Sequence, residues 1–140
     1  LLELCRRFHE EPMNLGVQFS SSRDIYHHFQ TRLGNLKQER FIIVILDNKH
    51  RFLSETTVTV GLLNRSLVHP REVFAEAIEQ RAAAIICIHN HPSGDSSPSE
   101  EDKRITRRLQ ESGELLGIPL PDHIIISKED FTSFADEGWL

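Results

Sequence analysis

Two histidines, His89 and His91, are separated by a single residue and directly follow an apolar run that ends at Ile88. In an extended chain, side chains two residues apart point to the same side, so both imidazoles can reach one metal ion. The spacing alone is weak evidence, because eight histidines scattered over 140 positions give about half such a pair by chance. A third candidate ligand is therefore needed.

Asp102 is that candidate. It lies three residues after Ser99, where a helix is expected to begin, and precedes Ile105 and Leu109 by three and seven residues. This spacing directs the carboxylate toward the apolar face of the helix, where it needs a partner. Two explanations are open at this point: Asp102 completes a capping box with Ser99, or it joins the two histidines around a metal ion.

Two imidazoles and one carboxylate are the protein ligands of a hydrolytic zinc site, which keeps its fourth position for water. Bound zinc lowers the pKa of that water to about 7, and the reaction also needs a proton acceptor. Glu39 and Glu55 are the glutamates next to apolar strands. We prefer Glu39, at the entry of the run 41–46, although an exposed charge is the common fate of such a residue. We expect Glu55 to be an ordinary polar-face residue.

The elements that must position these residues alternate between helix and strand. Ile25, Phe29 and Leu33 recur at helical spacing after Ser21, which forms a capping pattern with Asp24. Apolar periodicity, prolines and glycines predict a helix at 21–36, strands at 41–46 and 51–60, a helix from 70, a strand at 84–88, a loop at 89–98, a helix from 99 to a stop at Gly113, and a strand at 124–126. We therefore expect an α/β or α+β sandwich, with helices packed on a mostly mixed central sheet.

We expect two unequal parts. Residues 1–20 carry a short helical stretch and a Pro- and Gly-containing linker, which predicts the remnant of an upstream segment. Residues 21–140 form the domain proper. Because the sequence opens at Leu1 and its single methionine is Met13, we expect the chain to be a piece of a longer protein.

Composition describes an ordinary globular domain, with 39% hydrophobic residues among 140. Sixteen Lys and Arg against 21 Asp and Glu give a net charge of −5, which disfavours general phosphate binding. Cys5 and Cys87 do not form a disulfide framework, and no apolar run approaches the length of a membrane span. We expect a cytoplasmic protein that does not enter membranes.

The residues also match a known pattern. Residues 89–102 read H-x-H, seven residues, then S-x-x-D, which resembles the signature of JAMM (MPN+) zinc metalloproteases. The wording HNHPSG at 89–94, with HPREV at 69–73 and DHII at 122–125, resembles the bacterial RadC family from about Ser21 to Leu140. Pro121 departs from the leucine usual there; proline is tolerated at the entry of a strand.

This resemblance implies an MPN/JAB-like, cytidine-deaminase-like sandwich with Zn²⁺ held by His89, His91 and Asp102. It also implies that Glu39 is the general base and that Ser99 donates a hydrogen bond to the developing oxyanion. The expected reaction is hydrolysis of an amide or isopeptide bond in a polypeptide. Ser99 has a simpler explanation as a helix N-cap, and His123 is expected to be a hydrogen-bonded core histidine rather than a fourth ligand.

Two other functions compete with hydrolysis. The first is a DNA-associated accessory protein with a vestigial metal site, suggested by the basic residues Lys103, Arg104, Arg107 and Arg108. Acidic residues border that patch, which is typical of a solvated helix face, so we do not expect nucleic acid to bind through this domain. The second is a peptide-binding scaffold without turnover, whose partner affinity is expected to survive Glu39→Gln.

Overall fold

A computed structural model describes residues 15–61 and 68–140 of the chain. Its elements in chain order are α2 (Ser22–Leu33), β1 (Arg40–Leu46), β2 (Phe52–Val60), α3 (Pro70–Glu79), β3 (Ala84–Asn90), α4 (Glu100–Leu116), β4 (Asp122–Ile126) and β5 (Phe131–Ser133). The strands form one sheet in the order β2-β1-β3-β4-β5, in which β3 and β4 are parallel and the other neighbours antiparallel. The predicted mixed sheet is confirmed, and it is consistent with an MPN/JAB-like fold.

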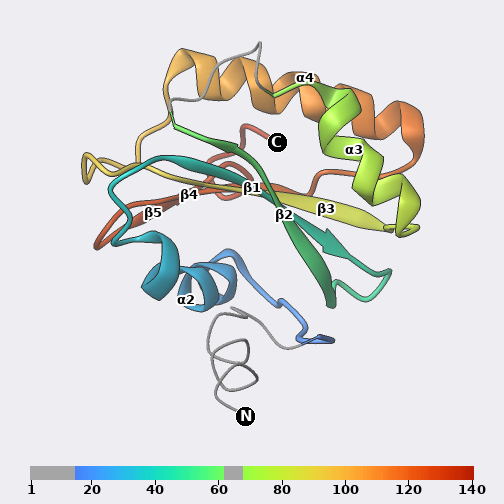
Figure 1. Cartoon of the computed structure of the whole chain (residues 1–140), viewed down its shortest axis with the longest axis horizontal. Helices are drawn as coiled ribbons and strands as arrows, with labels where there is room; N and C mark the ends of the chain where they lie inside the picture. Colours follow the sequence, from blue (N-terminus) through green and yellow to red (C-terminus); the bar gives the residue numbers. More distant parts are fainter. Residues whose placement is uncertain (1–14, 62–67) are drawn as a thin grey trace.

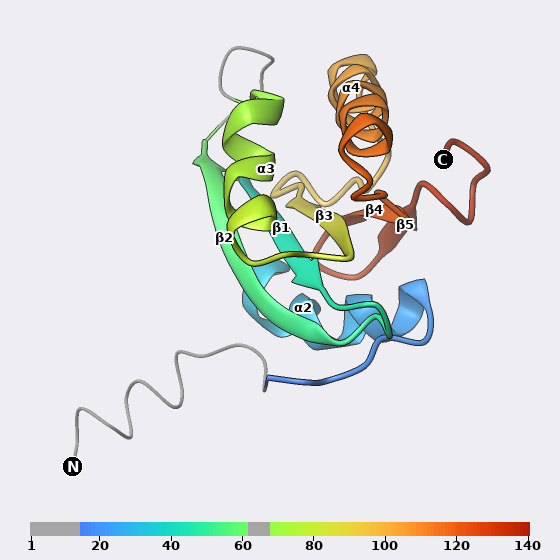
Figure 2. The ribbon, with the colours of Figure 1, turned by 90° about the vertical axis from the view of Figure 1, so that its right-hand side faces the viewer.

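Helices cover both faces of the sheet: α2 lies on one side, and α3 and α4 on the other (Figures 1 and 2). The β1 sequence explains why, because every residue from Phe41 to Leu46 is buried. Alternate side chains point to opposite faces, so Ile42 packs toward α2 while Ile43 packs toward α3 and α4. The continuous apolar run is thus a strand covered on both sides, as predicted.

The predicted helix starts are confirmed. The Ser21 hydroxyl accepts a hydrogen bond from the Asp24 amide at the start of α2, and His69 caps α3 just before Pro70. The spacing of Val73, Phe74, Ala77 and Ile78 predicts the buried face of α3, and this prediction was wrong at Ile78, which is 54% exposed. It lies in the last turn of the helix, at the margin of the face that Phe74 buries.

The predicted helix stop at Gly113 was also wrong, because α4 continues to Leu116 and ends at Gly117, whose φ is +72°. Gly113 is buried inside the helix, where a Cβ atom would lie 2.3 Å from the carbonyl oxygen of Ile118. This glycine therefore permits close packing instead of ending the helix. The short strand β5 was not predicted.

Part of the predicted linker contacts the domain. The Phe52 amide donates to the Val17 carbonyl, and Phe19 is buried in the core on the α2 side. The predicted helical stretch near the start lies in residues 1–14, outside the described residues, and the boundary after residue 20 stays a prediction. No helix within 15–61 and 68–140 is long and apolar enough to cross a membrane.

Candidate metal centre

The centre lies where β3 leaves the sheet. His89 is paired with Phe41 of β1, and β3 runs on to Asn90, two residues beyond the predicted end. The His91 amide donates to the Ile126 carbonyl on β4, after which the chain turns through Gly94 at a φ of +92°. Glycine adopts this backbone conformation without strain. The turn returns the chain to the start of α4, above the end of β3.

This turn brings Asp102 beside the two histidines, and Glu39, the residue before β1, lies beside His89 as well. His89 lies between two carboxylates: its Nε2 is 3.6 Å from Glu39 Oε2, and its Nδ1 is 3.6 Å from Asp102 Oδ1. His91 Nε2 lies 3.2 Å from Asp102 Oδ2. Among the described residues, Glu39, His89 and His91 form a possible metal-binding group, in which one ligand atom from each lies within 4.8 Å of the others. Asp102 is outside that group but contacts both histidines.

Asp102 also makes the capping box that the sequence offered as one explanation for its position. The Ser99 amide donates to Asp102 Oδ2 at 2.8 Å, and the Asp102 amide donates to the Ser99 hydroxyl oxygen at 3.0 Å. Both explanations of Asp102 therefore apply to the same carboxylate, because capping uses one of its oxygens and the histidines approach both. The capping bonds hold the carboxylate rigidly at the end of β3.

Hydrogen bonds fix the protonation of His91. Its Nδ1 lies 2.9 Å from the carbonyl oxygen of Asp95, which can only accept, so Nδ1 carries a proton and neutral His91 has its lone pair on Nε2. Burial opposes the charged form of His91, but the Asp102 carboxylate and the Asp95 carbonyl raise its pKa above the ordinary value. Burial likewise opposes ionisation of Asp102, yet His91 and the Ser99 amide lower its pKa to about 2.

His89 tests whether these residues fit a metal ion. Its side chain is 1% exposed, and both ring nitrogens are buried without a hydrogen-bond partner among the described residues. Buried polar atoms are rarely left unpaired, because each costs about 1–3 kcal/mol. Two imidazoles together with carboxylates make up the donor set of a divalent metal site. The residues present therefore fit a metal ion.

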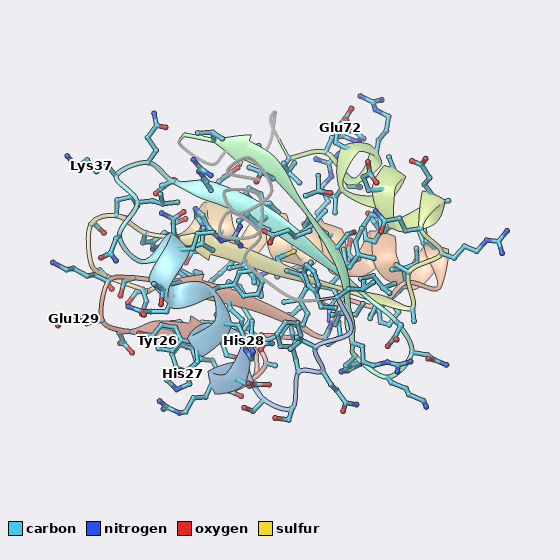
Figure 3. All side chains as sticks on the ribbon, turned by 60° about the horizontal axis from the view of Figure 1, so that its bottom comes forward. Tyr26, His27, His28, Lys37, Glu72 and Glu129 are labelled. Atoms are coloured by element: carbon cyan, nitrogen blue, oxygen red, sulfur yellow. The ribbon has the colours of Figure 1, made fainter. Side chains whose placement is uncertain are left out.

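Glu39 borders a solvent-accessible cavity of about 350 Å³. The cavity is lined by Lys37, Gln38, Glu39, Gly61, Pro92 and Ser93. Lys37, which lines this cavity, is exposed (Figure 3). His27 and His28 are also exposed, but they lie on α2 and do not line the cavity (Figure 3). Glu39 thus faces both His89 and the solvent. Glu55, in contrast, accepts two hydrogen bonds from Arg32, at 2.8 and 3.0 Å, as expected for a polar-face residue away from the centre.

Behind the centre, His123 is the hydrogen-bonded core histidine that the sequence predicted. It is completely buried, and its Nδ1 lies 2.5 Å from the hydroxyl oxygen of Thr106, which itself donates to the Asp102 carbonyl. Burial and the neighbouring His89 lower the pKa of His123 to about 3. Sequence reasoning missed Thr106; its signal was a polar residue four places after Asp102 on the inner face of α4. Cys87 is buried in the core, and burial raises the pKa of its thiol.

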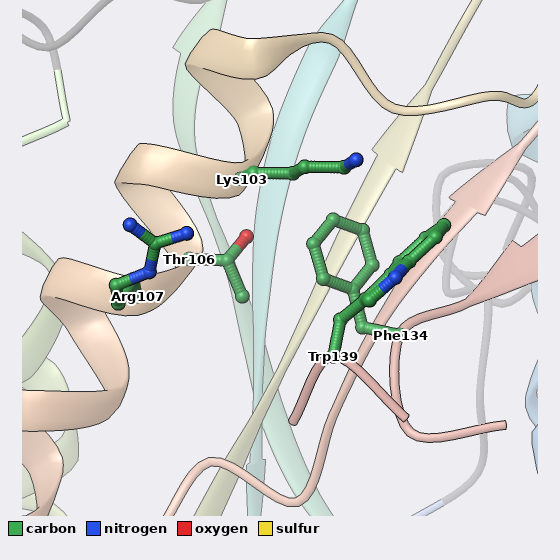
Figure 4. Close-up of a pocket in the computed structure, with 5 residues that line it drawn as sticks. All are labelled: Lys103, Thr106, Arg107, Phe134 and Trp139. Carbon is green, nitrogen blue, oxygen red and sulfur yellow. The ribbon is translucent and has the colours of Figure 1, made fainter. Parts of the chain in front are cut away.

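Thr106 also lines a second cavity, of about 110 Å³ (Figure 4). It is lined by Lys103, Thr106, Arg107, Phe134 and Trp139. The Lys103 ammonium lies 4.7 Å from the centre of the Trp139 ring, at a distance typical of a cation–π contact. This cavity is separate from the one that Glu39 borders.

Comparison with known proteins finds matches over nearly the whole chain. The family described as "RadC-like JAB domain" matches residues 19–139. A UPF0758 protein of Syntrophotalea carbinolica is 49% identical over 140 residues, which are 100% of this chain and 62% of that protein. UPF0758 proteins of Methanosarcina mazei and Thermotoga maritima are 46% and 44% identical, over 100% and 99% of this chain. The chain spans 61% and 62% of those two relatives.

Proposed function

The chain belongs to the RadC family of JAB domains, and from this membership and the geometry of the centre we propose that it is a zinc-dependent hydrolase of amide or isopeptide bonds in polypeptides. One observation carries the proposal. His89 is buried between the carboxylates of Glu39 and Asp102, each 3.6 Å away, and neither of its ring nitrogens has a hydrogen-bond partner among the described residues. The core histidine His123, in contrast, pairs its Nδ1 with Thr106 and leaves only Nε2 without a hydrogen-bond partner among the described residues.

His89, His91 and Asp102 are the proposed ligands of the ion. When bound, Zn²⁺ supplies a Lewis acid and an acidified water. Asp102 suits a ligand because its side chain is only 4% exposed and its low pKa keeps it ionised at neutral pH. The Asp95 carbonyl orients His91, as is usual for the second nitrogen of a ligating histidine.

Glu39 is the proposed general base. Its side chain is 22% exposed and borders the cavity through which water and a substrate can enter. A carboxylate there can accept a proton from the attacking water and return it to the leaving amine. The more buried Asp102 has no such access, so the two carboxylates are assigned different roles.

Ser99 is the proposed donor to the oxyanion. Its hydroxyl oxygen accepts the Asp102 amide as an N-cap, which uses a lone pair and leaves the hydroxyl hydrogen to donate. Capping and oxyanion stabilisation are therefore compatible in one side chain. Each well-placed donor to an oxyanion contributes about 3–4 kcal/mol to transition-state stabilisation.

The basic residues of α4 give less support to DNA association. Arg104 lies 3.5 Å from Glu101, and Lys103 lies 3.9 Å from Glu100, so part of the basic charge is paired on the helix itself. A surface of mixed charge binds phosphate backbones weakly. We therefore retain hydrolysis as the proposed function.

Zinc analysis of the purified domain with variant controls tests the proposal. We expect about one zinc per wild-type chain and almost none in His91→Ala, because a three-ligand site rarely survives the loss of a ligand. Glu39→Gln should keep its zinc but lose turnover of a quenched-fluorescence library of peptides and isopeptides. Equal zinc in wild type and His91→Ala would overturn the proposed site, and turnover by Glu39→Gln would overturn the assigned base.

A further inference from the structure

Asn90, which stands between the two histidines of the centre, holds the backbone on both sides of Glu39. Its side-chain oxygen accepts the Arg40 amide at 2.6 Å, and its side-chain nitrogen donates to the Gln38 carbonyl at 3.0 Å. Asn90 is 1% exposed, so neither bond competes with water. One buried amide group thus spans the residue that carries the proposed base.

This contact replaces the end of a strand ladder. The pairing of β1 with β3 stops at Phe41 and His89, so Asn90 and Arg40 are the next residues in register. Beyond that point the backbone of Asn90 follows β4, where it pairs with Ile126. The Asn90 side chain therefore continues the connection to β1 while the main chain turns away toward His91.

The opposite side of Glu39 is held by Gly61, the residue directly after β2. The Gly61 amide donates to the Glu39 carbonyl at 2.7 Å. The backbone of Glu39 is therefore bound on both sides, by Gly61 and by the Asn90 clamp, before its side chain extends toward His89. A base must be held close to its productive position, because small displacements lower rates strongly.

We propose that Asn90 is a positioning residue that couples the metal-binding strand to the general base, so that Glu39 and His89 keep a fixed separation. This inference rests on the proposed function for the role of Glu39. The hydrogen bonds on which the inference is based join residues of the chain itself and need no bound metal.

A double-mutant cycle on zinc affinity, measured by competition with a chromophoric chelator, tests the coupling. Glu39→Ala removes the negative charge 3.6 Å from His89 Nε2, and Asn90→Ala should release that charge from its position. We expect Asn90→Ala to weaken zinc binding about tenfold in the wild-type background but less than about twofold in the Glu39→Ala background. Equal weakening in both backgrounds, or none in wild type, would overturn the coupling.

Ser96→Ala is the matched control. Ser96 is a buried polar residue of the loop that follows Asn90, but its hydroxyl contacts Thr132 on β5, at 2.9 Å, instead of the Glu39 segment. We expect it to leave zinc affinity unchanged. Weakening by Ser96→Ala equal to that by Asn90→Ala would mean that any loop damage suffices, which contradicts a specific clamp.

Hydrogen exchange of the metal-free protein separates the clamp from the proposed function. In Asn90→Ala, the Arg40 amide should exchange about tenfold faster or more, because its acceptor is lost, while amides in the middle of β1 keep their protection. Unchanged protection at Arg40 would overturn the clamp even if zinc binds. A wild-type protein that binds no zinc but shows this change at Arg40 would overturn the proposed function and leave the clamp in place.

A separate set of observations concerns the cavity beside Trp139. Two of its five lining residues are cations, Arg107 and Lys103, of which Lys103 also lies 3.9 Å from Glu100 on the same helix; none of the five is acidic. Arg107 has no ion-pair partner among the described residues, unlike Arg104 on the same helix. The aromatic rings of Phe134 and Trp139 form the opposite wall (Figure 4). Two cations on an aromatic-walled cavity of about 110 Å³ suit a small oxyanion.

We infer that this cavity binds a carboxylate or phosphate group, independently of the metal centre. Trp139 is the single tryptophan of the chain, so its fluorescence reports on the cavity alone. Inorganic phosphate and N-acetylglycine, titrated at constant ionic strength, distinguish a free phosphate from a polypeptide carboxylate. We expect a saturable change with one of them, weakened about fivefold or more in Arg107→Gln.

Arg108→Gln is the control, because Arg108 is exposed on α4 but does not line the cavity. It should bind the anion as wild type does. No saturable change with either probe, or equal weakening in both arginine variants, would overturn the site.

Discussion

Among the residues that the structure describes, two carboxylates are buried, in very different surroundings. Asp122, at the start of β4, is 7% exposed and accepts hydrogen bonds only from neutral groups: the Ser133 hydroxyl at 2.6 Å and the amides of His123 and Ala135 at 2.7 and 3.0 Å. Asp102, at the start of α4, is 2% exposed and shares its oxygens between the Ser99 amide and two histidines. One carboxylate is enclosed by fixed donors, and the other faces ionisable ones.

The pKa values of the two groups move in opposite directions. Burial raises the pKa of Asp122, and its three hydrogen bonds do not offset that cost. At Asp102 burial acts the same way, but His91 and the Ser99 amide reverse it and lower the pKa to about 2. A buried carboxylate whose donors are all fixed stabilises the fold, whereas one facing titratable nitrogens is suited to binding a cation.

Asparagine substitutions at the two sites should separate these roles most strongly. Asp102→Asn should weaken zinc binding by roughly a hundredfold or more, because it removes a charged ligand, while Asp122→Asn should change it less than about twofold. Isothermal titration with zinc measures both. If instead Glu39→Gln abolishes zinc binding and Asp102→Asn keeps it, the ligand set is Glu39, His89 and His91, and the comparison fails.

For the stability of the metal-free protein, substitution of Asp122 should have the larger effect and substitution of Asp102 the smaller. Asp122→Ala leaves the Ser133 hydroxyl and two backbone amides without an acceptor, which should lower the free energy of unfolding by about 2 kcal/mol or more. Asp102→Ala removes a capping interaction and should cost about 1 kcal/mol. Urea unfolding near pH 3 checks both values, because the charge of Asp102 contributes less there than at neutral pH and protonated histidines bind no metal. A larger loss for Asp102→Ala would show that its carboxylate is mainly structural.

The contributions of Asp122 and Asp102 to the free energy of unfolding should change with pH in opposite directions. The folded pKa of Asp122 lies above its ordinary value of 3.8, so the stability that Asp122 contributes is complete below pH 3.8 and declines as the pH rises through the folded pKa. The folded pKa of Asp102 lies below 3.8, so its contribution is present above that value and is lost as the pH falls toward about 2.

Urea unfolding of the metal-free wild type and the two asparagine variants, over this acidic range, measures the effect. The stability difference between wild type and Asp102→Asn should grow with rising pH, and that between wild type and Asp122→Asn should shrink. Slopes of the same sign would contradict the assignment of the two carboxylates to different environments.

Most of the fold could be predicted from the sequence because its signals are local. The run 41–46 is apolar at every position, which only a strand covered on both faces explains. Gly113 was misinterpreted because a glycine that ends a helix and one that permits close packing look alike in a sequence; the contact with Ile118 that distinguishes them requires the fold. The three-residue β5 is too short for any periodicity to reveal.

The candidate site divides in the same way. The histidine spacing and the position of Asp102 on α4 are local patterns, and the structure brings these residues together with Glu39. The clamp from Asn90 to Gln38 and Arg40 spans 52 and 50 residues and could not be predicted from spacing. The link from His123 to Thr106 likewise joins a strand to a helix. Local sequence thus identifies the residues that carry chemistry better than those that hold them.

Ser99 offers the finest test, because its two roles can be separated by substitution. Ser99→Ala loses the N-cap and should cost about 1 kcal/mol of stability, whereas Ser99→Asp keeps an acceptor for the Asp102 amide and should stay within about 0.5 kcal/mol of wild type. Both variants lack the hydroxyl hydrogen that the oxyanion requires, so both should lose turnover. Thermal unfolding and a peptide-library assay, run in parallel, measure the two effects. If turnover is lost in Ser99→Ala but retained in Ser99→Asp, Ser99 acts only by holding Asp102 at the start of α4.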